Sequence, residues 1–269
     1  MKKGIDVSTY QGIIKWNKVH ASGVDFAMIK ATQGRSELNS AVEFFEDFKF
    51  RTNLVNAHDN DIRCGTYHYL TAESVKDAIE EAEYYLSVIS PFRSLVSLWA
   101  AVDVESTYLP RDKILLTKIV RAFCDKIESA GFKPMIYTNP NFIKNRLTNV
   151  SEYPLWLALW RNKELVPNER TYKNLHMWQY GPDNVKGITG TVDMNFLIKD
   201  IEEEKLMENK VDNTASQWAR DAVEWALQKG ILKGNTDGDL MLHKEVTREE
   251  MCVFLNRLYK EITDHNAKH

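Results

Sequence analysis

LVSLWAAVDVE, residues 95–105, is the longest and most apolar run in a chain of 269 residues. Its length and composition predict a buried β-strand. Alternate residues of a strand point to the same face, so Asp103 and Glu105 project together where this strand ends. Acids also follow ordinary strands out into solvent, and the pair alone does not separate a surface exit from a functional site.

Seven more short apolar runs accompany this one in the first 200 residues. They lie at residues 5–7, 25–31, 64–70, 133–138, 155–160, 176–180 and 191–196, with helical patterns at 42–60, 74–89 and 112–130. Strands that alternate with helices are typical of parallel βαβ units, and eight strands are the number that closes a barrel. After residue 150 the helical patterns shorten or vanish. We therefore expect an α/β fold for residues 1–203, an eight-stranded (β/α) TIM-like barrel whose second half is poor in helices.

Two of the predicted helices carry boundary signals. Ser74 is predicted to cap the helix at 74–89, with Asp77 as its acidic partner three residues later. Gly131 follows the pattern at 112–130 and is a usual C-terminal stop. These signals support the division into strands and helices.

The sequence changes character after the predicted barrel. Residues 204–213 are highly charged and are predicted to be a linker, and residues 214–269 are predicted to form a small all-α domain. Trp218 and Trp225 belong to one apolar helical stripe, and Thr247 with Glu250 predicts the capped start of a second helix. The intervening NTDGD, residues 235–239, is interpreted as a turn and not as a calcium loop.

The charge and hydropathy of the chain argue against two kinds of partner. The formal net charge of −3 offers no basic surface for nucleic acid and no polybasic anchor for a membrane. No segment approaches the roughly 20 apolar residues of a membrane span. The N-terminal MKKGIDVSTYQG lacks the apolar core of a secretory signal, so we expect the protein to stay at first in a cytoplasm.

Cysteine and histidine give no indication of a disulfide framework or a metal site. The three cysteines, Cys64, Cys124 and Cys252, are odd in number and widely spaced, and the seven histidines show no clustered spacing. His68 and His176 are interpreted as hydrogen-bonded structural residues. We expect no cofactor and no metal.

Two more acids are predicted to join Asp103 and Glu105 at the barrel rim, where the active sites of such barrels lie. Asp6 follows the first apolar run and Asp193 lies in the last, and barrel closure places the last strand beside the first. Four carboxylates in one pocket raise the pKa of at least one, as a general acid near neutral pH requires. Without metal-ligating histidines such a cluster favours glycoside hydrolysis, and the alternative is a site for a hard cation such as calcium or magnesium.

Aromatic and amide side chains near the strand ends are typical of a sugar-binding cleft. The candidates for substrate binding are Tyr67, Tyr69, Tyr137, Trp160, Trp178 and Gln179. Each aromatic taken alone is more typical of the protein core than of a ligand platform. Their repetition at successive strand ends is what favours a cleft.

The ordered set of motifs over about residues 1–200 resembles the glycoside hydrolase family 25 lysozymes. The matching segments are GIDVS (4–8), YQG (10–12), Trp16, FAMIKAT (26–32), Gly34, GTYHY (65–69), DVE (103–105), YTN (137–139), LWLA (155–158), MWQY (177–180) and GTVDMN (190–195). Two departures, Gln33 in place of the family's usual acid and Trp160 near a more typical tyrosine, bear on the shape of the sugar subsites and not on the carboxylates.

The resemblance implies cleavage of the β-1,4 bond after N-acetylmuramic acid in peptidoglycan. It implies that Glu105 is the general acid and that Asp6, Asp103 and Asp193 hold the substrate and stabilise the transition state. It implies that Tyr67 and Tyr137 line the cleft. The nucleophile stays open between one of the carboxylates and the acetamido group of the substrate.

The tail resembles one S-layer homology repeat. The matching pieces include WA (218–219), AV (222–223), WA (225–226), GIL (230–232) and VTREE (246–250). The resemblance implies a secondary cell-wall polymer as ligand, with Trp218 and Arg248 as candidate binding residues. Because such repeats usually act in threes, we expect this single repeat to bind weakly or to complete its site by self-association into a homo-oligomer.

Together these features resemble a phage endolysin that waits in the host cytoplasm and reaches the Gram-positive wall at lysis. A prophage copy or a cellular autolysin would have a similar sequence. Two other functions agree less well with the sequence. A non-catalytic glycan-binding module would not need four clustered acids, and a chitinase-like glycosidase would carry a DxxDxDxE motif where this chain has WAAVDVE.

Overall fold

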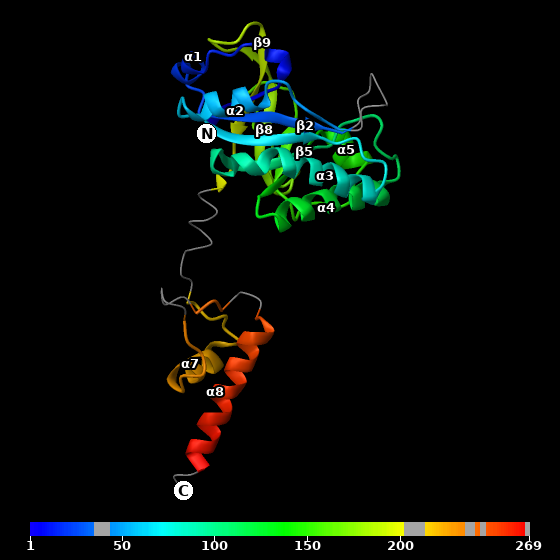
Figure 1. Cartoon of the computed structure of the whole chain (residues 1–269). Helices are drawn as coiled ribbons and strands as arrows, with labels where there is room; N and C mark the ends of the chain where they lie inside the picture. Colours follow the sequence, from blue (N-terminus) through cyan, green and yellow to red (C-terminus); the bar gives the residue numbers. More distant parts are fainter. Residues whose placement is uncertain (35–43, 202–212, 235–239, 243–245, 267–269) are drawn as a thin grey trace. The chain divides into compact units, whose positions relative to one another are not determined.

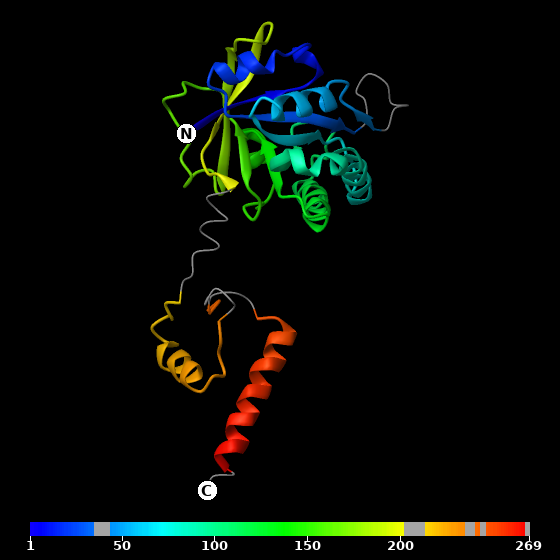
Figure 2. The same ribbon diagram turned by 60° about the vertical axis from the view of Figure 1, so that its left-hand side comes forward.

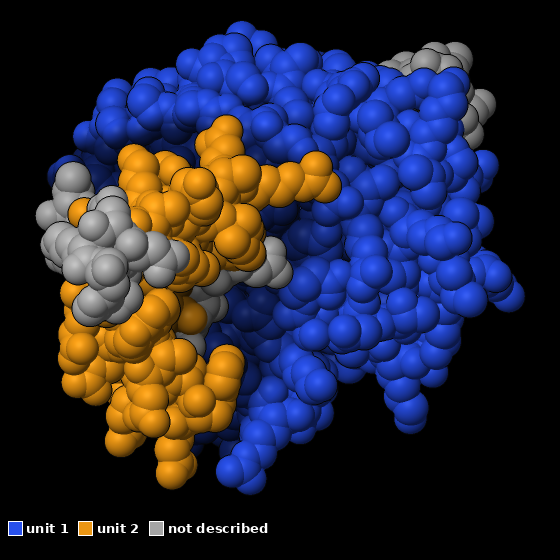
Figure 3. All heavy atoms as spheres, turned by 90° about the horizontal axis from the view of Figure 1, so that it is seen from below, with its two compact units in different colours: residues 1–201 blue, residues 202–269 orange. Residues whose placement is uncertain are grey.

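The computed structural model describes residues 1–34, 44–201, 213–234, 240–242 and 246–266. The chain divides into two compact units, residues 1–201 and residues 202–269, which Figure 3 colours separately. Each unit is described by itself. The linker predicted at 204–213 lies outside the described residues except for Asn213, as does the turn predicted at 235–239.

The first unit is the expected closed barrel (Figure 1). Its eight strands are β1 (Lys2–Val7), β2 (Phe26–Gln33), β4 (Arg63–Tyr69), β5 (Val96–Asp103), β6 (Pro134–Thr138), β7 (Leu155–Ala158), β8 (Leu175–Asn184) and β9 (Thr191–Leu197). The barrel closes because β1 pairs with β2 on one side and with β9 on the other. A ninth strand, β3 (Phe45–Glu46), pairs antiparallel with the end of β2. The predicted α/β class and strand number are confirmed.

The direction of β9 differs from the uniform parallel arrangement that the sequence predicted. This strand runs antiparallel to both of its neighbours, β8 and β1. A parallel connection needs a crossover of about a dozen residues or more, whereas only residues 185–190 join β8 to β9. The reversal brings the beginning of β9 to the same rim as the end of β1.

Helices cover the outside of the first half of the barrel (Figures 1 and 2). They are α1 (Trp16–Ala21), α2 (Phe50–His58), α3 (Val75–Ile89) and α4 (Lys113–Ser129), with short 3-10 turns η1 (Thr9–Gln11) and η2 (Ser90–Leu95). Between β6 and β9, where every residue is described, the only helix is the six-residue α5 (Pro140–Asn145), and β7 connects to β8 without a helix. The helix-poor second half is therefore confirmed.

The helix predicted at 42–60 is shorter than expected. Phe45 and Glu46 form β3, and α2 begins only at Phe50. Pairing with β2 determines the conformation of this segment in place of the local helical pattern. Residues 42 and 43 lie outside the described part of the chain.

Local capping signals and the structural role of His68 are confirmed. The Ser74 side chain accepts from the Asp77 backbone N–H, and Asp77 accepts from Ser74 in return. The buried His68 ring bonds Thr32 Oγ1 through Nδ1 and Glu81 Oε2 through Nε2, both at 2.7 Å. His68 thus links β4 to β2 and α3 on the outer wall of the barrel.

Barrel strands alternate between two apolar cores. Side chains such as Met28, Trp99 and Met177 fill the interior, whereas others such as Val102 and Phe123 pack between the barrel and its helices. Along β5 this alternation places Ala101 inside, Val102 outside and Asp103 inside again. Asp103 therefore lies at the top of the barrel interior.

The second unit contains the two predicted helices, α7 (Arg220–Gln228) and α8 (Arg248–Asn266). Thr247 begins α8 through a capping box, in which Thr247 Oγ1 accepts from the Glu250 N–H and Glu250 Oε2 accepts from the Thr247 N–H. A 2.7 Å ion pair between Lys229 and Glu261 joins the two helices. Within the described residues, no helix combines the length and apolar composition needed to cross a membrane.

Candidate active site

One cleft at the barrel rim collects all four carboxylates that the sequence singled out. It has a volume of about 180 Å³ and is lined by Asp6, Val7, Ser8, Tyr10, Gln11, Tyr67, Asp103, Glu105, Tyr137, Trp156, Gln179 and Asp193. These residues come from β1 and the turn after it, from β4 to β8, and from β9. Asp6 and Asp193 face each other as register partners of the antiparallel β1–β9 pair.

Two amides orient the Asp6 carboxyl. Its Oδ2 accepts from Asn195 Nδ2 at 2.8 Å and from Gln179 Nε2 at 3.0 Å. Each amide is held in turn, since Trp156 Nε1 donates to Asn195 Oδ1 at 2.7 Å and Tyr137 Oη donates to Gln179 Oε1 at 3.1 Å. A network of buried hydrogen bonds thus fixes the orientation of the Asp6 carboxyl.

Asp103 and Glu105 occupy different depths of the cleft. Asp103 is buried, and its Oδ1 has no hydrogen-bond partner among the described residues. Glu105 lies beyond the end of β5 and is exposed. The deeper carboxyl is therefore held away from solvent, whereas the outer one can reach a bound molecule.

Burial raises the pKa of every one of these acids, and repulsion from neighbouring carboxylates adds to the effect in three of them. Burial, and then the charge of Asp193, raise the pKa of Asp6 to about 7. Burial followed by the charge of Glu105 raises the pKa of Asp103 well above its usual range. Burial raises the pKa of Glu105 with a further contribution from Asp193, and burial alone raises that of Asp193. The cluster can therefore hold protons near neutral pH.

Lys30 is a charged residue near the site that the sequence analysis did not select. Its ammonium lowers the pKa of both Asp103 and Glu105, against the effect of burial. Its Nζ donates to Gln33 Oε1 at 2.7 Å and lies 5.2 Å from the centre of the Tyr69 ring. A single lysine within the otherwise apolar FAMIKAT strand was the available signal.

Only three of the six predicted substrate-binding residues line the cleft. Tyr67, Tyr137 and Gln179 do so. Trp160 lies beside it, 62% exposed, and donates from Nε1 to Gln179 Oε1 at 2.9 Å. Tyr69 is half-buried under Lys30 and is not part of the lining.

The prediction for Trp178 is wrong. Its side chain is fully buried, its Nε1 donates to the Leu159 carbonyl at 2.8 Å, and its ring lies against Tyr180 and Phe196. Neighbouring residues of a strand point to opposite faces, so Trp178 and Gln179 cannot both line the cleft. The structure directs Gln179 into it.

The lining also contains residues that the sequence analysis did not assign to the site, namely Val7, Ser8, Tyr10, Gln11 and Trp156. Ser8, Tyr10 and Gln11 belong to the turn directly after β1, at the rim where Asp6 lies. Asn195, which orients Asp6, was likewise not selected. Its position two residues after Asp193 on one strand was the available signal.

The two candidate ligand residues of the tail are both exposed. Trp218 is 90% exposed, and Arg248 is exposed as the first residue of α8. Neither residue belongs to a described cavity. In the described part of the chain, no group of three or more histidine, cysteine or acidic residues is arranged to hold a metal ion.

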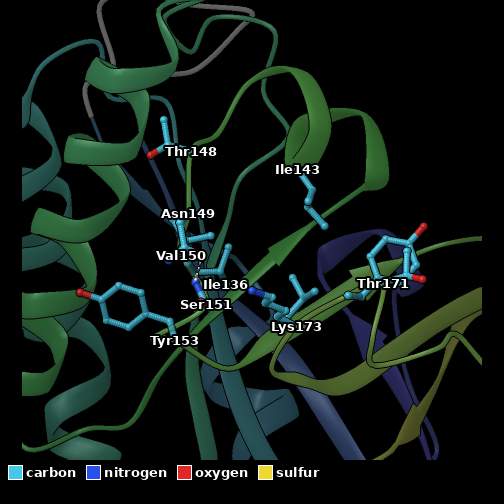
Figure 4. A pocket seen from close by; sticks show the side chains of 11 residues that line it. Ile136, Ile143, Thr148, Asn149, Val150, Ser151, Tyr153, Thr171 and Lys173 are labelled. Atoms are coloured by element: carbon cyan, nitrogen blue, oxygen red, sulfur yellow. Dashed lines mark hydrogen bonds between the residues drawn. The ribbon is translucent and has the colours of Figure 1, made fainter.

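A second cavity lies on the outer wall of the barrel (Figure 4). It has a volume of about 220 Å³ and is lined by Ile136, Ile143, Thr148, Asn149, Val150, Ser151, Tyr153, Leu155, Thr171, Tyr172 and Lys173. Its walls come from α5, from the loop before β7 and from the helix-free connection before β8. It contains no carboxylate and is separate from the acidic cleft.

Comparisons with known proteins agree with the division into a barrel and a tail. Residues 5–191 match the family profile described as glycosyl hydrolases family 25, and residues 211–252 match the S-layer homology domain. The autolytic lysozyme of Clostridium acetobutylicum is 32% identical over 195 residues, which are 72% of this chain and 55% of that protein. The chain thus spans about half the length of that curated relative.

Solved structures of similar fold include an endolysin and an autolysin. The CTP1L endolysin matches with a TM-score of 0.63 and 21% identity, over 97% of this chain and all of that one. The modular autolysin LytC of Streptococcus pneumoniae, solved with a synthetic peptidoglycan ligand, matches with a TM-score of 0.61 and 26% identity. The match with LytC covers 72% of this chain and 46% of that one.

Proposed function

Because the chain belongs to glycosyl hydrolases family 25, we propose that it cleaves the β-1,4 bond between N-acetylmuramic acid and N-acetylglucosamine in peptidoglycan. The observation that carries the proposal is the convergence of four carboxylates on one cleft with amide and aromatic walls. The lysozyme and autolysin relatives support peptidoglycan as the substrate.

We assign the role of general acid to Glu105. It is exposed in the cleft, and its raised pKa favours the protonated form that a general acid must carry into the reaction. It would give its proton to the glycosidic oxygen as the bond from that oxygen to the anomeric carbon breaks. Asp6, Asp103 and Asp193 would hold the sugar and stabilise the positive charge that develops on it.

Mass spectrometry of muropeptides released from purified Gram-positive walls tests this assignment. The wild-type protein should create new reducing-end N-acetylmuramic acid, and Glu105→Gln should lower the rate by at least about a hundredfold. Glu128→Gln, a change at an exposed position of α4, is the matched control. Reducing-end N-acetylglucosamine would contradict the proposed bond, and binding without any cleavage would favour the glycan-holding function.

We further propose that residues 1–203 are the catalytic domain, 204–213 a linker and 214–269 a wall-binding domain. The match to the S-layer homology domain supports a secondary cell-wall polymer as the ligand of the tail. Arg248 and Trp218 are both exposed there, and a guanidinium suits an anionic polymer group. Retention on walls that keep this polymer, lost in Arg248→Ala and on walls stripped of it, would support the assignment.

We propose a lytic role of the endolysin type, in which the protein remains in the host cytoplasm until the membrane opens. The combination of a wall-hydrolase barrel with a wall-binding tail supports this role. Expression in a Gram-positive host tests it, because lysis should begin only after the membrane is permeabilised. Altered growth or cell separation without permeabilisation would instead favour a cellular autolysin.

A further inference from the structure

Two aromatic side chains of the barrel unit are almost fully exposed, Tyr10 in the lining of the cleft and Phe48 next to Asp47, which binds the turn that carries Tyr10. Tyr10 and Phe48 each keep 88% of their surface accessible, more than any other aromatic residue described in the barrel unit. Exposed rings of this size at the edge of a cleft mark a surface that a ligand can cover.

A buried aspartate ties the backbone segments that carry these two rings. Asp47 is only 4% exposed, and its Oδ2 accepts from the Thr9 N–H at 2.9 Å. Its Oδ1 accepts from the Lys49 N–H, also at 2.9 Å. Tyr10 follows Thr9 and Phe48 follows Asp47. The hydrogen bond between Asp47 and Thr9 therefore holds the backbone segments that carry the two rings next to each other.

The turn that carries Tyr10 is rigid and continuous with the cleft. Ser8 Oγ accepts from the Tyr10 N–H at 3.2 Å, and Gln11 Oε1 accepts from the Ser8 N–H at 2.8 Å. Tyr10 itself belongs to the cleft lining together with Ser8 and Gln11. The exposed ring of Tyr10 therefore belongs to the cleft, and the Asp47 clamp holds the backbone of Phe48 next to the turn that carries Tyr10.

We propose that Tyr10 and Phe48 form a platform that binds the glycan strand beyond the sugars held among the carboxylates. The occupant is a polysaccharide because the platform is an extension of the cleft, and flat aromatic faces pack against the C–H faces of pyranose rings. Asp47 is the positioning residue of this platform. The inference rests on the proposed function and adds a preference for long strands over short fragments.

The test compares two substrates, purified glycan strands and a soluble tetrasaccharide muropeptide that fills only the cleft. Phe48→Ala should lower the ratio of kcat/KM on strands to kcat/KM on the tetrasaccharide by about tenfold, mainly through KM. Tyr10→Ala should lower the same ratio. Ile79→Ala, at a partly exposed position on α3, is the control and should leave the ratio unchanged.

Variants of Asp47 separate positioning from general stability. Asp47→Ala should lower the ratio as Phe48→Ala does, because the Thr9 clamp is lost. Asp47→Asn should restore part of the ratio, because its amide oxygen can still accept from the Thr9 N–H. A loss of melting temperature without a change in the ratio would overturn the role of Asp47.

Two results would overturn the platform. One is an unchanged ratio in Phe48→Ala, including an equal loss on both substrates. The other is undiminished retention on insoluble strands when Phe48→Ala is added to the inactive Glu105→Gln protein. Because the retention measurement needs no cleavage, it distinguishes failure of the platform from failure of the proposed function, in which the wild-type protein would cleave neither substrate.

Discussion

Asp6 combines two properties that oppose each other. Its Oδ2 accepts two amide hydrogen bonds, which favour the charged carboxylate. Burial and the charge of Asp193 have the larger effect and raise its pKa to about 7. The protein thus keeps, at its proposed site, a carboxyl whose ionisation works against folding.

This conflict predicts how stability depends on pH. The carboxyl has a pKa of 3.8 when free and about 7 in the folded protein. Between these pH values the folded chain holds a proton on Asp6 that the unfolded chain has released. The free energy of unfolding therefore has its full contribution from Asp6 below about pH 4 and loses that contribution as the pH rises through 7.

Asp6→Asn removes the ionisation and keeps the shape of the side chain. It should raise the free energy of unfolding by about 1–3 kcal/mol at pH 8 and have almost no effect near pH 4. Denaturant unfolding at the two pH values measures the difference, with Asp59→Asn at an exposed position as control. Equal effects of Asp6→Asn at both pH values would contradict the raised pKa.

At the scale of the element, the buried hydrogen bonds between α3 and the outer wall of the barrel at β4 are expected to contribute strongly to the free energy of unfolding. Glu81 accepts from the Thr71 N–H and hydroxyl and bonds the His68 ring, all within buried surroundings. Glu81→Ala should therefore destabilise the barrel by about 3 kcal/mol, because it removes three hydrogen bonds to buried polar groups.

The neighbouring residue provides the control for this change. Glu80 is 46% exposed and pairs only with the exposed Lys76 across one helical turn. Glu80→Ala should change the free energy of unfolding by less than about 0.5 kcal/mol. Thermal or denaturant unfolding measures the free energy of unfolding of both variants. If Glu81→Ala and Glu80→Ala lower it by similar amounts, the buried hydrogen bonds of Glu81 do not stabilise the contact between α3 and the barrel.

Strand patterns made most of the barrel predictable, and they failed where tertiary pairing decides. The apolar runs located all eight strands, and the i and i+2 rule placed Asp103 and Glu105 at one rim. The direction of β9 depends on the length of one connection, and the first part of the helix predicted at 42–60 pairs with β2 as a strand instead. Periodicity within a segment contains neither kind of information.

Within the cleft, the sequence predicted chemistry better than orientation. Acids stand out in apolar strands, so all four carboxylates were found. Trp178 and Gln179 are adjacent, and only the register of β8 decides which one faces the cleft. Lys30 acts on Asp103 and Glu105 at the end of β5, and Asn195 of β9 binds Asp6 of β1, so both roles become visible only after the barrel closes.

At the scale of the whole molecule, the two units differ in how much apolar surface they bury. The barrel has an interior core and an outer one, whereas Ile231 is the only buried apolar side chain among the residues described after 212. Met251, Leu255 and Ile262 on α8 are 47%, 57% and 52% exposed. A unit this small with so little buried surface gains stability when another surface covers these side chains.

We expect a second copy of the tail to provide that surface, which sedimentation velocity can measure as a mass that rises with protein concentration. Leu255→Lys should keep the protein monomeric, because it places a charge in the apolar contact, whereas Lys260→Glu at an exposed position of the same helix should not. Association also multiplies the wall-binding sites on one particle, so Leu255→Lys should weaken retention on walls and leave the rate on a short soluble muropeptide unchanged. A wild-type protein that stays monomeric at all concentrations would mean that each tail binds the wall polymer alone, with correspondingly lower affinity.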